Sequence, residues 1–103
     1  MLAKKYKIKS SKEFQKIYKH SRKLNSNLLF VKFATNNYGI SRFGVVVSRK
    51  VSSLAVKRNK IKRQIFSVLR DIVKQFNKSY DIILIARKKI SQVNYQEIKK
   101  DII

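Results

Sequence analysis

Apolar residues recur at helical spacing near both ends of the sequence. Ser10 followed by Glu13 forms a capping-box pattern that predicts a short helix over about residues 11–20, and one face of that helix carries Phe14, Ile17 and Tyr18. Asn94 and Glu97 repeat the capping pattern before a final short helix, whose apolar face carries Tyr95, Ile98 and Ile102.

A longer helical segment lies between Ser48 and Tyr80. Its apolar residues return to one stripe at about 100° per residue: Leu54, Ile61, Ile65, Val68, Leu69, Ile72 and Phe76. Ser52 or Ser53 is expected to cap its start. The residues that point away from the core are Asn59, Lys60, Arg63, Ser67, Arg70 and Lys74. Arg58 projects close to the stripe, so either the first turn overhangs the sheet or Arg58 lies in a groove.

Three segments have the patterns of strands. Residues 28–35 alternate, so that Leu29, Val31 and Phe33 face one way while the opposite face carries Phe30, Lys32 and Ala34. Residues 42–48 are rich in β-branched side chains and follow the turn residues 36–39, which predicts a hairpin. Residues 81–86 begin with Asp81 and are continuously apolar from Ile82 onward, as expected for a strand that is covered on both faces or central in its sheet.

The order helix, strand, strand, helix, strand, helix predicts an α+β fold in which helices pack against a small sheet. A chain of 103 residues with 44% hydrophobic positions is sufficient for one packed domain, and we assign it residues 1–103.

The net charge of the chain indicates what kind of partner it binds. Lys and Arg total 26 against five acids, which gives a net charge of +21. So much like charge on a small surface is relieved by an anionic partner. The cations are densest over residues 56–65, VKRNKIKRQI.

Groups for protein-based chemistry are scarce. The chain has no cysteine, which excludes disulfides and thiolate metal sites. His20 is the only histidine and is expected to interact with a helix C-terminus. The acids are scattered; we expect Asp71 to form a helix-surface ion pair and Asp81 simply to begin its strand. We therefore predict neither a catalytic residue nor a metal site on the protein.

The sequence shows neither the apolar run of a signal peptide nor the roughly 20 apolar residues of a membrane span. We expect a soluble, cytoplasmic protein without a membrane partner.

The sequence contains the cationic and aromatic side chains that nucleic-acid binding requires. Cations displace counterions from phosphates, and aromatic rings beside them stack on unpaired bases. RNA is favoured over DNA, because the basic segment has few neutral groups for base edges beyond Asn59 and Gln64 and no helix-turn-helix spacing. Phe14 and Tyr18 could instead be plain core packing, and Phe14 is the one expected to be more buried.

Three segments together resemble a known family. Residues 43–65, FGVVVSRKVSSLAVKRNKIKRQI, residues 81–91, DIILIARKKIS, and residues 10–23, SSKEFQKIYKHSRK, are similar in order and spacing to the protein subunit of bacterial ribonuclease P. The resemblance implies a two-layer sandwich like domain 2 of ribosomal protein S5, with a mixed sheet and a left-handed βαβ crossover.

The resemblance also implies a function. Such a protein joins a catalytic RNA that removes the 5′ leader of precursor tRNA by Mg²⁺-dependent hydrolysis, with the Mg²⁺ held mainly by the RNA. The residues that would face the catalytic RNA are Lys57, Arg58, Asn59, Lys60, Lys62 and Arg63. Those that would line a cleft for the leader are Phe14, Tyr18, Phe30 and Lys32. Departures from the family pattern occur at Lys32, Lys60 and Phe66.

Other interpretations remain open at this point. A structural RNA-binding protein of the ribosomal type would share the charge and fold but need no leader cleft. A self-sufficient nuclease would need an acid cluster that the sequence lacks. A basic module for membrane surfaces would need an apolar stripe on the outward helix face.

Overall fold

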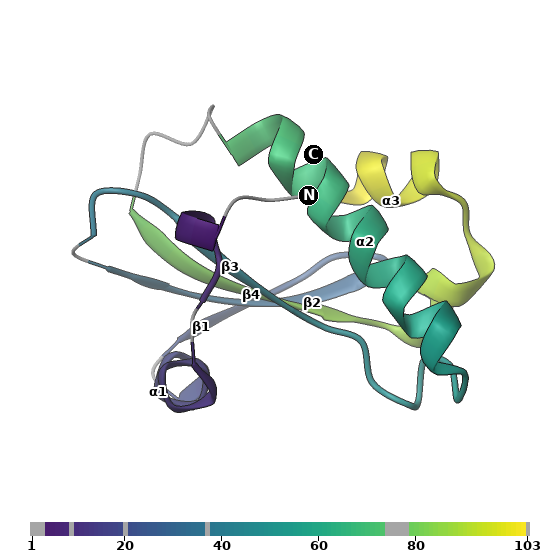
Figure 1. The fold of residues 1–103 in the computed structure, drawn as a ribbon, viewed down its shortest axis with the longest axis horizontal. Coiled ribbons are helices and arrows are strands. Elements are labelled where there is room, and N and C mark those ends of the chain that lie inside the picture. Colours follow the sequence, from purple (N-terminus) through teal and green to yellow (C-terminus); the bar gives the residue numbers. More distant parts are fainter. Residues whose placement is uncertain (1–3, 9, 20, 37, 74–78, 103) are drawn as a thin grey trace.

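The computed structural model describes residues 4–8, 10–19, 21–36, 38–73 and 79–102. In these residues the α-helices are α1 (Ser11–Lys19), α2 (Ala55–Ile72) and α3 (Tyr95–Ile102), and the strands are β1 (Arg22–Asn25), β2 (Leu29–Thr35), β3 (Arg42–Val46) and β4 (Tyr80–Ala86). Short 3₁₀ helices span Lys4–Tyr6 and Lys88–Gln92. Helix α1 lies on one face of the sheet, and α2 and α3 lie on the other (Figure 1). The predicted α+β class is confirmed.

The sheet has the order β1-β2-β4-β3. Strand β4 pairs antiparallel with β2 and parallel with β3, so β2 and β3 are not neighbours. The predicted hairpin of β2 and β3 is therefore wrong, because the apolar β4 takes the central position between them. The actual hairpin joins β2 to β1, a strand that the hydrophobic pattern did not predict.

The β3–α2–β4 crossover is left-handed. In Figure 1 both strands run in the same direction below α2, and β1 is the most distant strand, so the sheet order puts β4 behind β3. Seen from the helix side with the strands pointing upward, β4 lies to the left of β3. This hand opposes the strong right-handed preference of such connections and agrees with the family resemblance.

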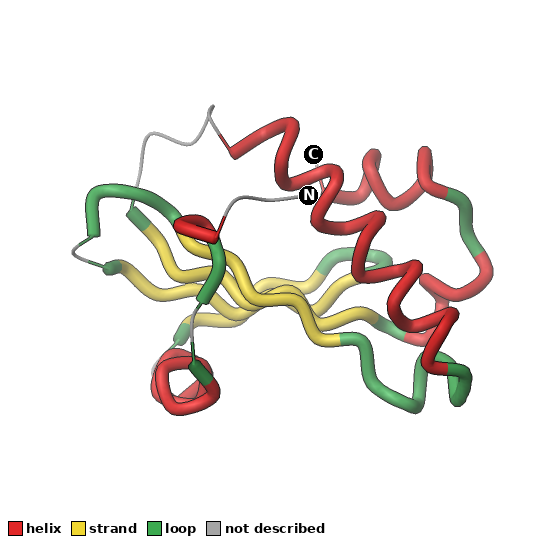
Figure 2. Tube along the Cα trace, in the orientation of Figure 1, coloured by secondary structure: helices red, strands yellow, loops and turns green. Residues whose placement is uncertain are grey.

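The main core lies between the sheet and α2 with α3, and Figure 2 shows the strands as one layer below these helices. The predicted stripe of α2 is buried at Ile61, Ile65, Val68 and Leu69. Across from it the sheet contributes Phe43, Val45, Leu84 and Ala86. Leu54, predicted in the same stripe, is instead 65% exposed because it precedes the first helical turn. Phe76 lies outside the described residues.

The two short helices are capped as predicted, but the long one is not. The Glu13 N–H donates to Ser10 Oγ at 3.2 Å, and the Glu97 N–H donates to Asn94 Oδ1 at 3.0 Å. At the start of α2 the N-cap residue is Leu54, which makes no side-chain capping bond, so neither serine caps the helix. Ser52 Oγ accepts a hydrogen bond from the Leu54 N–H instead.

Within the ranges given above, no helix combines the length and the apolar character that a bilayer crossing requires.

Candidate nucleic-acid interface

The basic surface of α2 faces solvent. Of the residues predicted to contact the catalytic RNA, Arg58 is half-buried and the exposed ones are Lys57, Asn59, Lys60, Lys62 and Arg63. The ion pairs among the described residues involve none of them. We call these six residues the basic helix face. Its cations are therefore not neutralised within the described part of the protein.

Arg58 folds back onto the loop before the helix. Its Nη1 donates to the carbonyl oxygens of Ser52 and Ser53, both at 3.0 Å. This contact fixes the loop against the first turn of α2 and explains how a cation is accommodated beside the apolar stripe. The hydrogen bonds leave the charge of the guanidinium in place, since both acceptors are neutral.

A hollow lies between the start of α2 and the chain that leads into α3. It has a volume of about 470 Å³, and Lys57 and Lys60 line it together with Gln64, Gln92 and Asn94. Two residues of the basic helix face therefore project over a polar recess.

The opposite face of the sheet consists of three rows of side chains across the strands. The row nearest the start of β3 and β4 contains Arg42, Asp81 and Ala34; the next contains Gly44, Ile83, Lys32 and Lys23; the third contains Val46, Ile85, Phe30 and Asn25. Helix α1 lies on this side of the sheet (Figure 1). The four residues predicted to line the leader cleft all belong to this layer.

Helix α1 covers the first two rows closely. A methyl group in place of the Gly44 hydrogen would lie 3.0 Å from the Phe14 ring, so glycine is what lets α1 approach β3. Phe14 is accordingly half-buried, whereas Tyr18 is 41% exposed. The expectation that Phe14 is the more buried of the two is confirmed.

Lys32 is held against Tyr18. Its Nζ lies 3.6 Å from the centroid of the Tyr18 ring and donates to the Tyr18 carbonyl oxygen at 3.1 Å. The ammonium therefore covers part of the ring and places a positive charge beside the exposed remainder. An aromatic edge next to a fixed cation can accept a base together with its phosphate.

The third row forms the floor of a groove that α1 leaves uncovered. This groove has a volume of about 540 Å³; Phe30 and Ile85 contribute apolar surface, and the lining cations are Lys50, Arg87, Lys88 and Lys89. We call it the sheet groove. The sequence prediction included Phe30 but none of these four cations, although the run ARKK directly after an apolar strand was a signal for three of them, Arg87, Lys88 and Lys89.

An ion-pair network ties α1 to the sheet at the first row. Arg42 Nε donates to Asp81 Oδ1 at 2.9 Å, and Arg42 Nη2 donates to Asp81 Oδ2 at 3.0 Å. Arg42 Nη1 donates to Glu13 Oε2 at 3.3 Å, and its guanidinium carbon lies 4.2 Å from the centroid of the Tyr38 ring. The hydrogen bond with Asp81 is the main cause that raises the pKa of Arg42 above its ordinary value. Asp81 therefore does more than begin a strand.

The side chains of four of the five acids, Glu13, Asp71, Asp81 and Asp101, have hydrogen-bond or ion-pair partners. Asp101 accepts hydrogen bonds from the Ser26 hydroxyl at 2.6 Å and from the Leu28 N–H at 3.2 Å, which ties α3 to the β1–β2 turn. Asp71 pairs with Arg70 at 3.6 Å, as predicted. In the described part of the chain, no three acidic or histidine side chains come together to hold a metal. His20 lies outside the described residues.

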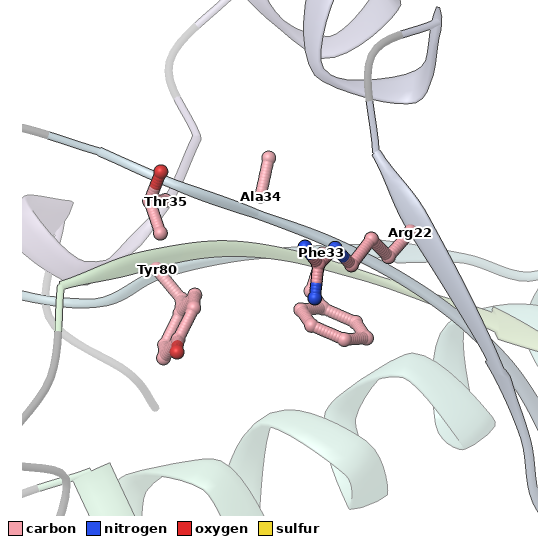
Figure 3. Close-up of a pocket in the computed structure, with 5 residues that line it drawn as sticks. All are labelled: Arg22, Phe33, Ala34, Thr35 and Tyr80. Atoms are coloured by element: carbon pink, nitrogen blue, oxygen red, sulfur yellow. The ribbon is translucent and has the colours of Figure 1, made fainter.

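A further pocket of about 270 Å³ lies near the start of β4, on the side of the sheet that faces α2. The rings of Phe33 and Tyr80 point to the same side of the sheet, with the Arg22 side chain beside them (Figure 3). The rings pack edge to face, 6.0 Å between centroids. We assign this pocket no ligand, because the rings pack against each other and it contains none of the predicted site residues.

Comparisons with known proteins agree with this architecture. The family model described as ribonuclease P matches residues 2–103. The ribonuclease P protein component of Syntrophomonas wolfei is 32% identical over 103 residues, which cover 100% of this chain and 86% of that protein. That of Clostridium kluyveri is 38% identical over 100 residues, covering 94% and 88%.

Solved structures show the same similarity. A Staphylococcus aureus RNase P protein mutant with defective mRNA degradation activity matches with a TM-score of 0.88 and 32% identity, over 96% of this chain and 83% of that chain. The RNase P protein from Thermotoga maritima matches with a TM-score of 0.84 and 30% identity, over 93% and 90%.

Proposed function

This chain belongs to the ribonuclease P protein family, and we propose that it binds the catalytic RNA and the 5′ leader of precursor tRNA in the cytoplasm. In this role it assists the Mg²⁺-dependent endonucleolytic removal of the leader. The RNA subunit would hold the Mg²⁺ and carry out the hydrolysis.

One observation carries this proposal. The acids Glu13, Asp81 and Asp101 are engaged in holding the fold together, while the cations of the basic helix face and the sheet groove have no ion-pair partner among the described residues. The net charge is +21, and these three carboxylates are held in structural contacts. The exposed surface is therefore suited to bind a polyphosphate chain.

The two surfaces suit two different tasks. The basic helix face offers cations and one amide on a rigid helix, which is adequate to contact the phosphates of a folded RNA. The sheet groove combines an apolar floor with cations at its rim, and Lys32, which contacts Tyr18, lies in the row next to that floor on the same face of the sheet. Such a surface favours single-stranded RNA, whose unpaired bases stack while its backbone is neutralised.

Reconstitution with the catalytic RNA and a precursor tRNA tests the proposal. At low Mg²⁺ the protein should raise the rate of leader removal, because its cations replace part of the charge screening that Mg²⁺ supplies at higher concentration. The matched control substrate is the same tRNA with its leader shortened to one nucleotide.

The Tyr18→Ala variant separates the leader contact from the contact with the catalytic RNA. We expect it to weaken binding of the full-leader substrate about tenfold, the loss of one stacking contact, and to leave the short-leader substrate unchanged. Stimulation that does not depend on the leader would indicate a structural RNA-binding role instead. Cleavage by the protein without RNA would indicate a nuclease.

A further inference from the structure

Two aliphatic side chains project into solvent at the start of α2. Leu54 is 65% exposed and Val56 is 80% exposed, and Val56 is the most exposed large hydrophobic residue in the described part of the chain. Isolated exposed aliphatics are common on protein surfaces. These two are not isolated, since they lie two residues apart next to the basic helix face.

The helical spacing aligns Val56 with part of that surface, at its N-terminal end. Asn59, Lys60 and Arg63 follow it at three, four and seven residues, so the four side chains share one side of α2. Leu54 immediately precedes the first turn, in an extended conformation with φ −85° and ψ 118°. An apolar spot is therefore continuous with a surface of unpaired cations.

Local stability does not account for either residue. Leucine is among the poorest N-cap residues, and Leu54 makes no side-chain capping bond. Valine has a lower helix propensity than alanine, lysine or glutamine, and Val56 packs against little when it is 80% exposed. Leu54 and Val56 thus contribute little to the stability of the folded chain, although both lie at the surface and close together. Their presence points to a contact made outside the chain.

We propose that Leu54 and Val56 form an apolar contact with an unstacked base of the catalytic RNA, beside the phosphate contacts of the basic helix face. The inference rests on the proposed function and adds to it. Cations bind phosphates wherever they occur and so select no particular place on an RNA. Apolar side chains, by contrast, bind favourably only where a base has been displaced from its stack. Apolar side chains that insert between base pairs of a duplex make contacts of this kind. Leu54 and Val56 would thereby direct the basic helix face to a place in the RNA where a base is unstacked.

The test measures the affinity for the catalytic RNA at several salt concentrations, using Leu54→Ser and Val56→Thr. Serine is a favoured N-cap residue, so Leu54→Ser should be at least as stable as the parent protein. The matched control is Leu24→Ser, the same substitution at a leucine that is 60% exposed on the edge strand β1. Circular dichroism and the thermal midpoint confirm that each variant is folded.

We expect Leu54→Ser and Val56→Thr each to weaken binding about three- to tenfold by the same factor at every salt concentration, since apolar burial releases no counterions. Leu24→Ser should change the affinity less than twofold. Unchanged affinity for both test variants, a loss equal to that of Leu24→Ser, or a changed salt slope would each overturn the inference. These outcomes leave the proposed function standing, because that function fails only if the protein does not stimulate cleavage of the full-leader substrate.

Discussion

At the residue scale, Arg42 differs from the cations of the basic helix face and the sheet groove because it is buried and paired with a carboxylate. Its side chain is 7% exposed and that of its partner Asp81 is 8% exposed. A buried pair of this kind persists because both oxygens of the carboxylate accept hydrogen bonds from the guanidinium. Because the pKa of Arg42 is raised, its stabilising contribution is fully present below the ordinary arginine pKa and is lost only as the pH rises beyond it.

Removing the charge of Asp81 should therefore destabilise the protein strongly. Asp81→Asn leaves the Arg42 guanidinium buried beside a neutral group, and we expect the free energy of unfolding to fall by about 3–5 kcal/mol. Urea denaturation measures this change. Asp71→Asn is the matched control, because Asp71 pairs with Arg70 at an exposed position and its loss should cost less than about 1 kcal/mol. Equal effects in the two variants would contradict the role assigned to Arg42.

The sequence could not have predicted this pair. Arg42 and Asp81 are 39 positions apart, and each stands at the start of an apolar strand where a charged residue is ordinary. Only the parallel register of β3 and β4 puts the two residues opposite each other. By contrast, the capping bonds of Ser10 and Asn94 involve residues three positions apart, and the sequence pattern predicted both.

At the scale of elements, α2 presents an apolar stripe to the sheet and cations to solvent. Its buried residues return every three or four positions, which is why the helix could be predicted from the sequence. The strand β1 could not, because RKLN offers a single apolar residue and all four of its residues are exposed. The pairing of β2 was also mispredicted, since strands that are close in sequence are not always neighbours in a sheet.

The outward cations of α2 should set the salt dependence of RNA binding. We expect Arg63→Ala to reduce the slope of log K against log salt by about 0.7–0.9, the value for one phosphate contact. Binding titrations with the catalytic RNA between about 50 mM and 300 mM salt give this slope. Arg70→Ala is the control on the same helix, because Arg70 is already paired with Asp71 and should contribute a smaller change. A larger change for Arg70 than for Arg63 would refute the assignment of the basic helix face.

At the scale of the whole molecule, the net charge of +21 opposes the compact state. Raising the NaCl concentration from about 20 mM to about 300 mM should therefore raise the thermal midpoint by about 4–8 °C, equivalent to about 1 kcal/mol. Differential scanning calorimetry measures this shift. The variant Lys57→Gln with Lys62→Gln removes two unpaired charges and should show a smaller response. A thermal midpoint that falls as the NaCl concentration rises would contradict this prediction. It would mean that attraction within ion pairs outweighs the repulsion among the cations.

The family resemblance supplied the part of the topology that the residue pattern did not contain. Hydrophobic periodicity fixes which face of α2 is buried, but it does not distinguish a left-handed from a right-handed crossover, because both bury the same stripe. The predicted cleft was likewise incomplete, since the cations after β4 reach the floor around Phe30 only through the pairing of β2 with β4.

The sheet order also determines when the protein can fold during its synthesis. As the ribosome releases the chain, β2, β3 and α2 emerge before β4, yet β4 is the strand that both β2 and β3 must pair with. Until Ala86 has left the exit tunnel, the nascent chain has an unclosed sheet and a cationic helix with its apolar side uncovered. Folding of the main core is therefore a late event that waits for the release of β4, and chains that end before Ala86 expose surfaces that chaperones and proteases recognise.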